Sequence, residues 1–417
     1  MRILYLAPHD IWPLTTGARL RDFYLARELA RRASVTFFGI RHPGDPEPEN
    51  PPASAGFERT LTVTKPASFT PGRILRGLIG PTPVTVLNFV SPAMTAEIRS
   101  VLSGARFDTV QVEGVHLAPY ADLVRSIQGE RPIISDWHNI ESELMRRYGE
   151  RASGLRGLAA RRTASLLKRT EDRLLRQCDV CTVASDRERE QLSRRNPTVE
   201  LAFVPNGVDV DYYAEAEIAS AYDNAGRPHD GQPRHVLFVG SMDYHANIDG
   251  VLWFTREVWP EVRRRYPGRR FIIVGRDPSP EVRALAAEDV EITGTVRDVR
   301  PFYANAVAVV APLRVGGGTR LKILEAMAAG VPAISTRLGA EGLEVEDELD
   351  ILFADDAEGT ISAISRIIDR PEDGRRIAEA ARRRVCAVYG WSAIGARLYD
   401  IHAKALEHRG AGRVTAL

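Results

Sequence analysis

Short apolar runs recur along the chain, and most of them are followed by residues with the apolar spacing of a helix. The first run, residues 2–7, precedes a helical pattern over residues 20–29 and a second run at residues 35–40. A strand, a helix and a strand in this order predict a parallel pair of strands joined by a helical crossover. Similar runs predict strands at residues 60–63, 107–112, 132–135, 179–184, 199–204, 235–239, 271–274, 290–293, 307–311 and 331–335.

The alternation resumes after residues 214–234, whose weak periodicity indicates a linker. We therefore expect the α/β fold class, with two doubly wound, Rossmann-like parallel-sheet domains facing a cleft. The predicted domains are residues 1–205 and 206–389, which suits a chain of 417 residues. Residues 390–417 are expected to form a helix that crosses back to the N-terminal domain and ends in a frayed tail.

The composition is that of a soluble globular protein. Charged residues make up 27% of the chain, and the formal net charge of +1 argues against nucleic acid as a partner. Three cysteines form no disulfide framework and fit a reducing compartment. Neither a signal peptide nor an apolar run long enough to span a membrane is recognisable. We expect a cytoplasmic location.

A basic stretch qualifies this expectation. Residues 146–176 carry ten arginines and lysines against three acidic residues, with leucines interleaved. A basic amphipathic helix of this kind is typical of peripheral contact with an anionic membrane, here at the inner face. A solvated helix face with its leucines in the core explains the same pattern.

One loop and helix, residues 311–330 (APLRVGGGTRLKILEAMAAG), predict a binding site. A glycine-rich turn that leads into a helix presents unpaired backbone N–H groups and the positive end of the helix dipole, which bind phosphate. Arg320 and Lys322 add positive charge, and Glu325 lies one turn further on, placed to accept hydrogen bonds from sugar hydroxyls. The pattern indicates a nucleotide-sugar site.

Polar residues in the N-terminal half follow predicted strands. In an open parallel sheet, ligands bind beyond the carboxyl ends of the strands, so residues that follow these ends are candidates for one cleft. The acceptor-side candidates are His9, Glu113, His116 and Asp136, with Gly17 and His138 expected nearby.

The motifs resemble those of glycosyltransferase family 4, the retaining glycosyltransferases of the GT-B fold. The C-terminal half carries FVGSMDYHANIDGVLWF, ITGTVRDVRPFY, VPNGVD and APLRVGGGTRLKILEAMAAGVPAIST, the last typical of a GGGTRLK subgroup. The N-terminal half is similar more loosely, through LAPHDIWPLTTGARLRDFYLARELA, SDWHNIES and ASDRERE. The resemblance implies transfer of a sugar, such as a hexose, from a nucleoside-diphosphate donor to an acceptor hydroxyl with retention of configuration. Arg320, Lys322 and the helix start would supply the positive charge at the diphosphate, so we expect the transfer to be metal-independent.

The resemblance also implies roles for single residues. Glu325 would bind the donor ribose, Arg320 and Lys322 would neutralise the diphosphate, and His138 would lie near the transferred sugar. These four residues are the catalytic candidates. The donor-binding candidates are Gly17, Gly240, Ser241, Thr295, Val296, Gly317, Gly318, Thr319 and Leu321.

Two departures from the family pattern leave alternatives open. The first glutamate of the EX7E motif is replaced by Gly317, and the usual basic loop is replaced by residues 240–243. These changes favour the alternative of a weakly active or inactive nucleotide-sugar-binding partner subunit. A GT-B nucleotide-sugar epimerase is a further alternative, although Gly317 supplies none of the acid and base residues that it would need. No cofactor and no metal are expected, because the sequence offers no carboxylate cluster suited to Mg²⁺. The acceptor class is a saccharide, a lipid-linked saccharide or a small-molecule aglycone.

Overall fold

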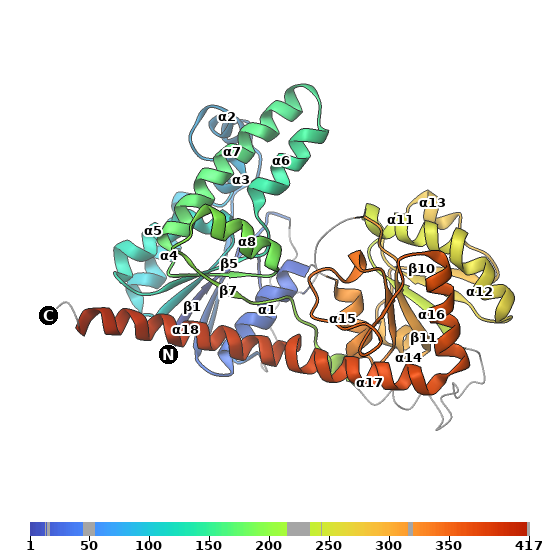
Figure 1. The fold of residues 1–417 in the computed structure, drawn as a ribbon. Coiled ribbons are helices and arrows are strands. Elements are labelled where there is room, and N and C mark those ends of the chain that lie inside the picture. Colours follow the sequence, from blue (N-terminus) through green and yellow to red (C-terminus); the bar gives the residue numbers. More distant parts are fainter. Residues whose placement is uncertain are drawn as a thin grey trace. The chain divides into compact units, whose positions relative to one another are not determined.

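The computed structural model describes residues 1–12, 14, 17–44, 55–214, 234–242, 244–315 and 320–414. The chain divides into two compact units (Figure 1). The first unit is Met1–Pro205 with Ile394–Leu417, and the second unit is Asn206–Ala393. Each unit is an α/β domain built on a parallel sheet, which confirms the predicted fold class.

The first unit contains a seven-stranded sheet in the order β3-β2-β1-β4-β5-β6-β7, and all of its strand pairs are parallel. The strand order reverses beside β1, so the chain leaves β1 and β4 toward opposite sides and opens a crevice at their carboxyl ends. The strands are β1 (Arg2–Leu6), β2 (Ser34–Arg41), β3 (Arg59–Thr64), β4 (Thr109–Glu113), β5 (Ile133–Trp137), β6 (Val180–Val183) and β7 (Glu200–Phe203).

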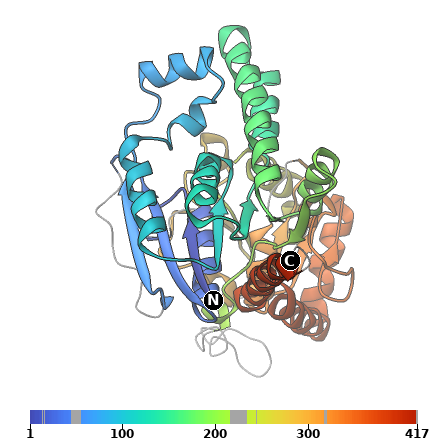
Figure 2. The ribbon, with the colours of Figure 1, turned by 90° about the vertical axis from the view of Figure 1, so that its left-hand side faces the viewer.

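Helices cover both faces of this sheet (Figure 2), so its central strands are buried on both sides. The helices are α1 (Gly17–Ala30), α2 (Pro71–Ile79), α3 (Val84–Leu87), α4 (Pro92–Gly104), η2 (Val115–Leu117), α5 (Ala118–Gln128), α6 (Glu141–Arg151), α7 (Gly154–Gln177) and α8 (Asp186–Arg195).

The last helix, α18 (Trp391–Val414), belongs to the first unit from Ile394 onward. Ala405 and Ile401 pack on Ile134 and Val180 of the sheet. At Gly395 a Cβ atom would stand only 2.0 Å from Cβ of Glu28 in α1, so only glycine permits this close approach of the two helices.

The second unit contains a six-stranded sheet in the order β10-β9-β8-β11-β12-β13, again with parallel pairs. The strands are β8 (His235–Val239), β9 (Phe271–Val274), β10 (Val290–Gly294), β11 (Ala306–Ala311), β12 (Ala333–Ser335) and β13 (Leu352–Phe353). The helices are α9 (Val210–Ala214), α11 (His245–Trp253), η3 (Phe254–Val258), α12 (Trp259–Arg265), α13 (Pro280–Arg283), α14 (Arg300–Ala304), α15 (Leu321–Ala328), η4 (Leu338–Ala340), α16 (Ala357–Asp369) and α17 (Pro371–Val388).

Several expectations need correction. Residues 65–95, for which the sequence pattern predicts no strand or helix, contain α2, α3 and the start of α4. The basic stretch forms two helices, α6 and α7, and α18 continues to Val414, into the segment expected to be a frayed tail. Most of the predicted linker (residues 215–233) lies outside the described residues. Within the described part of the chain, no helix has the length and apolarity needed to cross a membrane.

Candidate functional site

The glycine-rich loop of the second unit leads from β11 to the first turn of α15, where Arg320 is the residue before the helix. Gly317, Gly318 and Thr319 lie outside the described residues. Only 4% of Arg320 is exposed, and its Nη2 donates to the carbonyl oxygen of Leu338 at 2.8 Å. Its buried Nε has no hydrogen-bond partner in the part of the chain that the structure describes, and burial lowers the pKa of this guanidinium. A buried cation with an unused donor at a helix start favours an anionic ligand.

Lys322 follows in the same turn. Its Nζ donates to Oδ1 of Asn247 at 2.9 Å and lies 5.0 Å from the ring centre of Phe238. Burial lowers its pKa to about 8, because the charged ammonium is only partly compensated there. A bound anion would stabilise the charged ammonium of Lys322 and raise its pKa toward the usual value.

Asn247 connects Lys322 with the loop after β8. Its Nδ2 donates to the carbonyl oxygen of Ser241 at 2.8 Å, and a Cβ atom on Gly240 would stand 2.8 Å from the same nitrogen. Arg276, which follows β9, donates from Nε to Oγ of Ser241 at 2.9 Å. Sequence reasoning missed Asn247 and Arg276, although Arg276 follows the end of a predicted strand.

Glu325 lies on the next turn of α15. Its Oε2 accepts a hydrogen bond from Tyr303 Oη at 2.8 Å, and Tyr213 also donates to this carboxylate. The pKa of Glu325 is raised, because burial outweighs these hydrogen bonds and the charge of Lys322, which lower it. Two tyrosines therefore orient the carboxylate, and neither was predicted. Of the remaining donor-side candidates, Thr295 is exposed after β10, whereas Val296 and Leu321 are half-buried.

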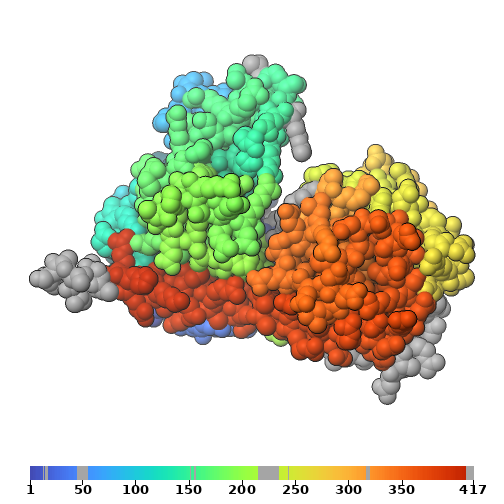
Figure 3. Space-filling view, viewed as in Figure 1, coloured from blue at the N-terminus to red at the C-terminus, as the bar shows by residue number. Residues whose placement is uncertain are grey.

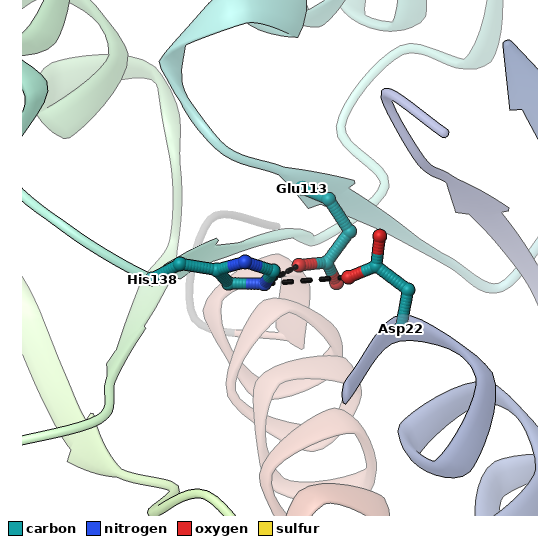
Figure 4. Close-up of side chains that lie close together, drawn as sticks. All are labelled: Asp22, Glu113 and His138. Atoms are coloured by element: carbon teal, nitrogen blue, oxygen red, sulfur yellow. Dashed lines mark hydrogen bonds and ion pairs between the residues drawn. The ribbon is translucent and has the colours of Figure 1, made fainter. Parts of the chain in front are cut away.

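The first unit gathers a second cluster at the carboxyl ends of β4 and β5. Figure 4 shows His138, just after β5, pointing at carboxylates from β4 and α1. His138 Nε2 lies 3.1 Å from Glu113 Oε2, 3.3 Å from Asp22 Oδ1 and 3.0 Å from Asp136 Oδ2. His138 keeps 23% of its side chain exposed, whereas the three carboxylates are buried. Only the imidazole is thus presented to a ligand.

Asp136 is bound on its other side by Arg21 of α1. Arg21 donates from Nε and Nη2 to the two Asp136 oxygens, each at 2.8 Å, and also to the carbonyl oxygens of Val204 and Pro205. Burial raises the pKa of Asp136, but the Arg21 guanidinium outweighs burial and lowers it well below its usual range. Asp136, a predicted acceptor-side residue, therefore anchors Arg21, and Arg21 joins α1 to the end of β5 and to the residues after β7.

The remaining charges of the cluster set the state of His138. Burial lowers the pKa of His138, but its hydrogen bonds to Asp136, Asp22 and Glu113 raise it well above its usual value. Burial and the charge of Asp136 raise the pKa of Glu113 to about 7. At neutral pH the cluster is thus an imidazolium held among carboxylates.

A chain of buried hydrogen bonds runs from this cluster to α18. Gln111 donates from Nε2 to Glu113 Oε1 at 3.0 Å, and its Oε1 lies 3.0 Å from His402 Nε2. The other ring nitrogen of His402 lies 2.7 Å from Thr109 Oγ1. Burial lowers the pKa of His402 to about 3, so this ring is neutral and donates one bond while accepting the other.

His9 and His116, the other histidine candidates, are half-buried in the same unit. His9 stacks on His42 with ring centres 5.9 Å apart, and His116 lies 5.2 Å from Phe89. Burial lowers the pKa of each to about 4, so both are neutral at pH 7. Gly17 is the exposed first residue of α1, with open space where a side chain would stand.

The sequence predicts no carboxylate cluster suited to Mg²⁺, whereas the fold brings two carboxylates and a histidine together. Asp22, Glu113 and His138 offer ligand atoms that all lie within 4.8 Å of one another, a spacing that a metal ion can bridge. Asp22 Oδ1 meets only His138 Nε2, at 3.3 Å, and Asp22 Oδ2 lacks a hydrogen bond within the described residues. Asp22 was missed because α1 brings it to the strand ends through the fold, and no local pattern marks it.

Comparisons with known proteins agree with this architecture. A family model described as Glycosyltransferase Family 4 matches residues 22–212, and one described as Glycosyl transferases group 1 matches residues 233–370. The chain is 25% identical over 318 residues to a phosphatidyl-myo-inositol mannosyltransferase of Mycolicibacterium smegmatis, covering 75% of each protein. It is 28% identical over 244 residues to a GDP-mannose-dependent alpha-(1-6)-phosphatidylinositol monomannoside mannosyltransferase of Mycobacterium tuberculosis, covering 53% of this chain and 61% of that protein.

Solved structures share the fold. A sucrose-phosphate synthase from Thermosynechococcus elongatus superposes with a TM-score of 0.66 at 19% identity, covering 98% of this chain and 100% of that one. Anabaena HepE in complex with UDP and glucose superposes with a TM-score of 0.61 at 15% identity, covering 96% and 99%.

Proposed function

Because the chain is a glycosyltransferase of family 4 with the GT-B fold, we propose that it transfers a hexose from a nucleoside-diphosphate donor to an acceptor hydroxyl, with retention of configuration and without a metal ion. Relatives named for GDP-mannose and for phosphatidylinositol favour a donor and an acceptor of these kinds. The enzyme needs no cofactor besides its substrates, and its location is cytoplasmic with peripheral membrane contact.

The start of α15 carries this proposal. When the glycosidic bond of the donor breaks, negative charge grows on the departing diphosphate, and donors fixed in place stabilise that charge more than the ground state. Arg320 offers a buried Nε without a partner in the described chain, and burial lowers the pKa of Lys322 to about 8. Both cations gain more from an incoming diphosphate than solvated side chains would, so they replace a metal ion in this role.

The remaining donor contacts follow from the same sheet edge. Glu325, oriented by Tyr303, accepts hydrogen bonds from the ribose. Thr295 and Val296 lie along the base, and Gly240, Ser241 and Leu321 line the donor. Gly17, in the first unit, stays a donor-phosphate candidate by resemblance to the family alone. Gly317 supplies no carboxylate to the transferred sugar, so the hydroxyls of the hexose are recognised elsewhere.

His138 acts on the sugar side. Its imidazolium, held by Glu113 and Asp22, donates a hydrogen bond to the transferred sugar and has no need to serve as a base. The acceptor hydroxyl attacks the anomeric carbon from the side that the diphosphate leaves. The acceptor oxygen forms the new bond, the bond to the diphosphate breaks, and the diphosphate oxygen takes the hydroxyl proton. His9 and His116 are neutral candidates for contacts with the acceptor.

The test is a thermal-shift panel of nucleoside diphosphates followed by donor turnover. Ligand binding raises the melting temperature by mass action, so one diphosphate should stabilise the protein. Arg320→Ala and Glu325→Ala should each lower turnover about 100-fold or more, as expected for lost transition-state contacts. Arg375→Ala, an exposed arginine of α17, is the control and should turn over normally.

Near-normal transfer by Arg320→Ala or Glu325→Ala would overturn the site. Nucleotide binding by the wild type without any donor turnover would instead identify a partner subunit that binds nucleotide sugar.

A further inference from the structure

Helices α2, α6 and α7 form a projection of the first unit (Figure 3). Most of the exposed large apolar side chains of the described chain lie on it. Arg162 of α7 donates to the carbonyl oxygen of Gly80, just after α2, at 3.1 Å, which joins the two parts. Of eleven exposed large apolar residues in the described chain, eight lie here. They are Phe69, Ile74, Leu75, Leu78, Ile79, Leu144, Tyr148 and Leu158. Such a concentration marks an interaction surface.

Helix α2 is the most exposed part of this projection. Leu75 is 57% and Ile79 is 74% exposed, and both would be covered in a helix that packed its apolar face on a core. The buried member of the helix is Gly77, whose backbone lies against Val84. The helix thus turns its small residue inward and its large apolar residues outward.

The charge of the projection selects the partner. Residues 69–80 and 141–165 contain eight arginines and three glutamates, and the segment with α2 has no acidic residue. Apolar side chains flanked by arginines fit the boundary between the headgroups and acyl chains of an anionic membrane. A protein partner would need a face that is both apolar and acidic. An anionic membrane offers apolar acyl chains and acidic headgroups over its whole surface.

A pocket of about 600 Å³ lies beside α2, between this helix and the start of α4. Arg73, Arg76 and Arg99 line it together with apolar Leu87, Val90 and Pro92, and its lining contains no acidic residue. Arg73 Nη1 is buried without a hydrogen-bond partner, and Arg76 and Arg99 form no ion pair within the described residues. Three guanidinium groups around one hollow match the oxygens of a phosphate.

We propose that this projection docks on an anionic phospholipid bilayer, with a lipid phosphate in the three-arginine pocket and the exposed side chains of α2 inserted among the acyl chains. In this arrangement α6 and the first part of α7, which lie near α2, add positive charge to the docking surface. Farther along α7, Lys168 pairs with Asp172 and Arg173 pairs with Asp122. If the chain transfers a sugar as proposed above, docking also implies that the acceptor hydroxyl belongs to a lipid-borne molecule, and this part of the inference rests on the proposed function.

Vesicle binding of the full chain tests the proposal without any nucleotide. The protein should bind vesicles of phosphatidylglycerol and phosphatidylcholine and should not bind phosphatidylcholine alone. Arg76→Gln with Arg99→Gln should lower the partition constant about 30-fold, because each arginine near an anionic surface contributes roughly fivefold. Leu75→Ser with Ile79→Ser should lower it about tenfold or more.

Matched controls lie on the second unit. Arg375→Gln with Arg382→Gln on α17 removes the same charge from exposed arginines, and Leu349→Ser removes an exposed leucine. Both variants should bind vesicles within about twofold of the wild type. An equal loss in the arginine control would show that the whole charge and not the pocket attracts the membrane, and would overturn the proposal.

Two further outcomes would also overturn it. Absence of binding to anionic vesicles excludes the membrane. Saturation of the pocket by soluble glycerol phosphate, at an affinity matching that for vesicles, identifies a free phosphate compound as its ligand. Nucleotide affinity, measured separately by calorimetry, should be unchanged in every variant, so failure of docking is distinguishable from failure of the donor site.

Discussion

At the scale of single residues, Lys322 joins the donor side to pH. Burial lowers its pKa to about 8 in the free protein, whereas a bound diphosphate favours the charged form. Donor affinity therefore depends on a proton that Lys322 loses as pH rises through about 8.

We expect nucleoside-diphosphate affinity to fall about tenfold between pH 7 and pH 9, because one proton is taken up on binding above the pKa of the free protein. Calorimetry across this range measures the slope directly. The variant Lys322→Met should bind more weakly at pH 7 and should lose the pH dependence. An unchanged slope in this variant would assign the titration to another group.

The candidate site shows which residues a sequence can reveal. Arg320, Lys322 and Glu325 share one loop and helix, and His138 follows a strand end, so local patterns predict them. Asp22 and Arg21 stand in the middle of an ordinary helical pattern, and only the fold places them against Glu113 and Asp136. Whether the predicted residues bind substrate stays a prediction that the variants above test.

At the scale of elements, α18 supports the cluster around His138. His402 fills the space between Thr109 and Gln111, and Gln111 in turn holds Glu113. The helix and its return to the first domain were predicted, but its contact with β4 joins residues 291 positions apart, His402 and Gln111, which no local pattern encodes.

His402→Leu should lower the free energy of unfolding by about 2–4 kcal/mol, because two buried polar groups lose their partner. It should also lower turnover, with the acidic limb of the pH–rate profile displaced as Glu113 loses its fixed position. Urea denaturation and the pH profile measure the two effects. His402→Gln, which keeps one hydrogen bond, should recover part of both, and a profile unchanged in shape would reduce His402 to a purely structural role.

Helix α2 illustrates the opposite limit of sequence reasoning. Its segment reads as irregular because Pro71, Gly72, Gly77 and Gly80 interrupt the helical pattern. Its large apolar residues also point to solvent, so they lack the one-sided burial that identifies a helix on a core. Hydrophobic periodicity identifies helices that bury one face in the core, so it does not detect a helix whose apolar residues face solvent.

At the scale of the whole molecule, both sheets were predictable because strand and helix alternate throughout, and β13, only two residues long, was missed. Glu113, Asp136 and His138 were predicted to share one cleft, whereas Asp22 was missed, and its arrival beside Glu113 makes metal dependence an experimental question. Asp22, Glu113 and His138 lie within reach of one ion, although His138 already carries the positive charge there.

Metal-independent transfer predicts that EDTA leaves the initial rate within about twofold, since Arg320 and Lys322 supply the charge on the donor side. Glycosyl transfer in chelator-treated buffer is the measurement, with added Mn²⁺ as the comparison. A rate that collapses with EDTA, returns with Mn²⁺ and no longer responds in Asp22→Asn would establish the cluster as a metal site.

The return of α18 to the first unit also shapes how the protein is made. When residues 1–205 have left the ribosome, Ile134 and Val180 are not yet covered by α18. Thr109 and Gln111 do not yet have their hydrogen bonds to His402. Synthesis of the intervening second unit takes about 20 seconds at about 10 residues per second. During that interval the nascent first sheet presents an open apolar face, so chaperone capture is expected to act on this half of the chain.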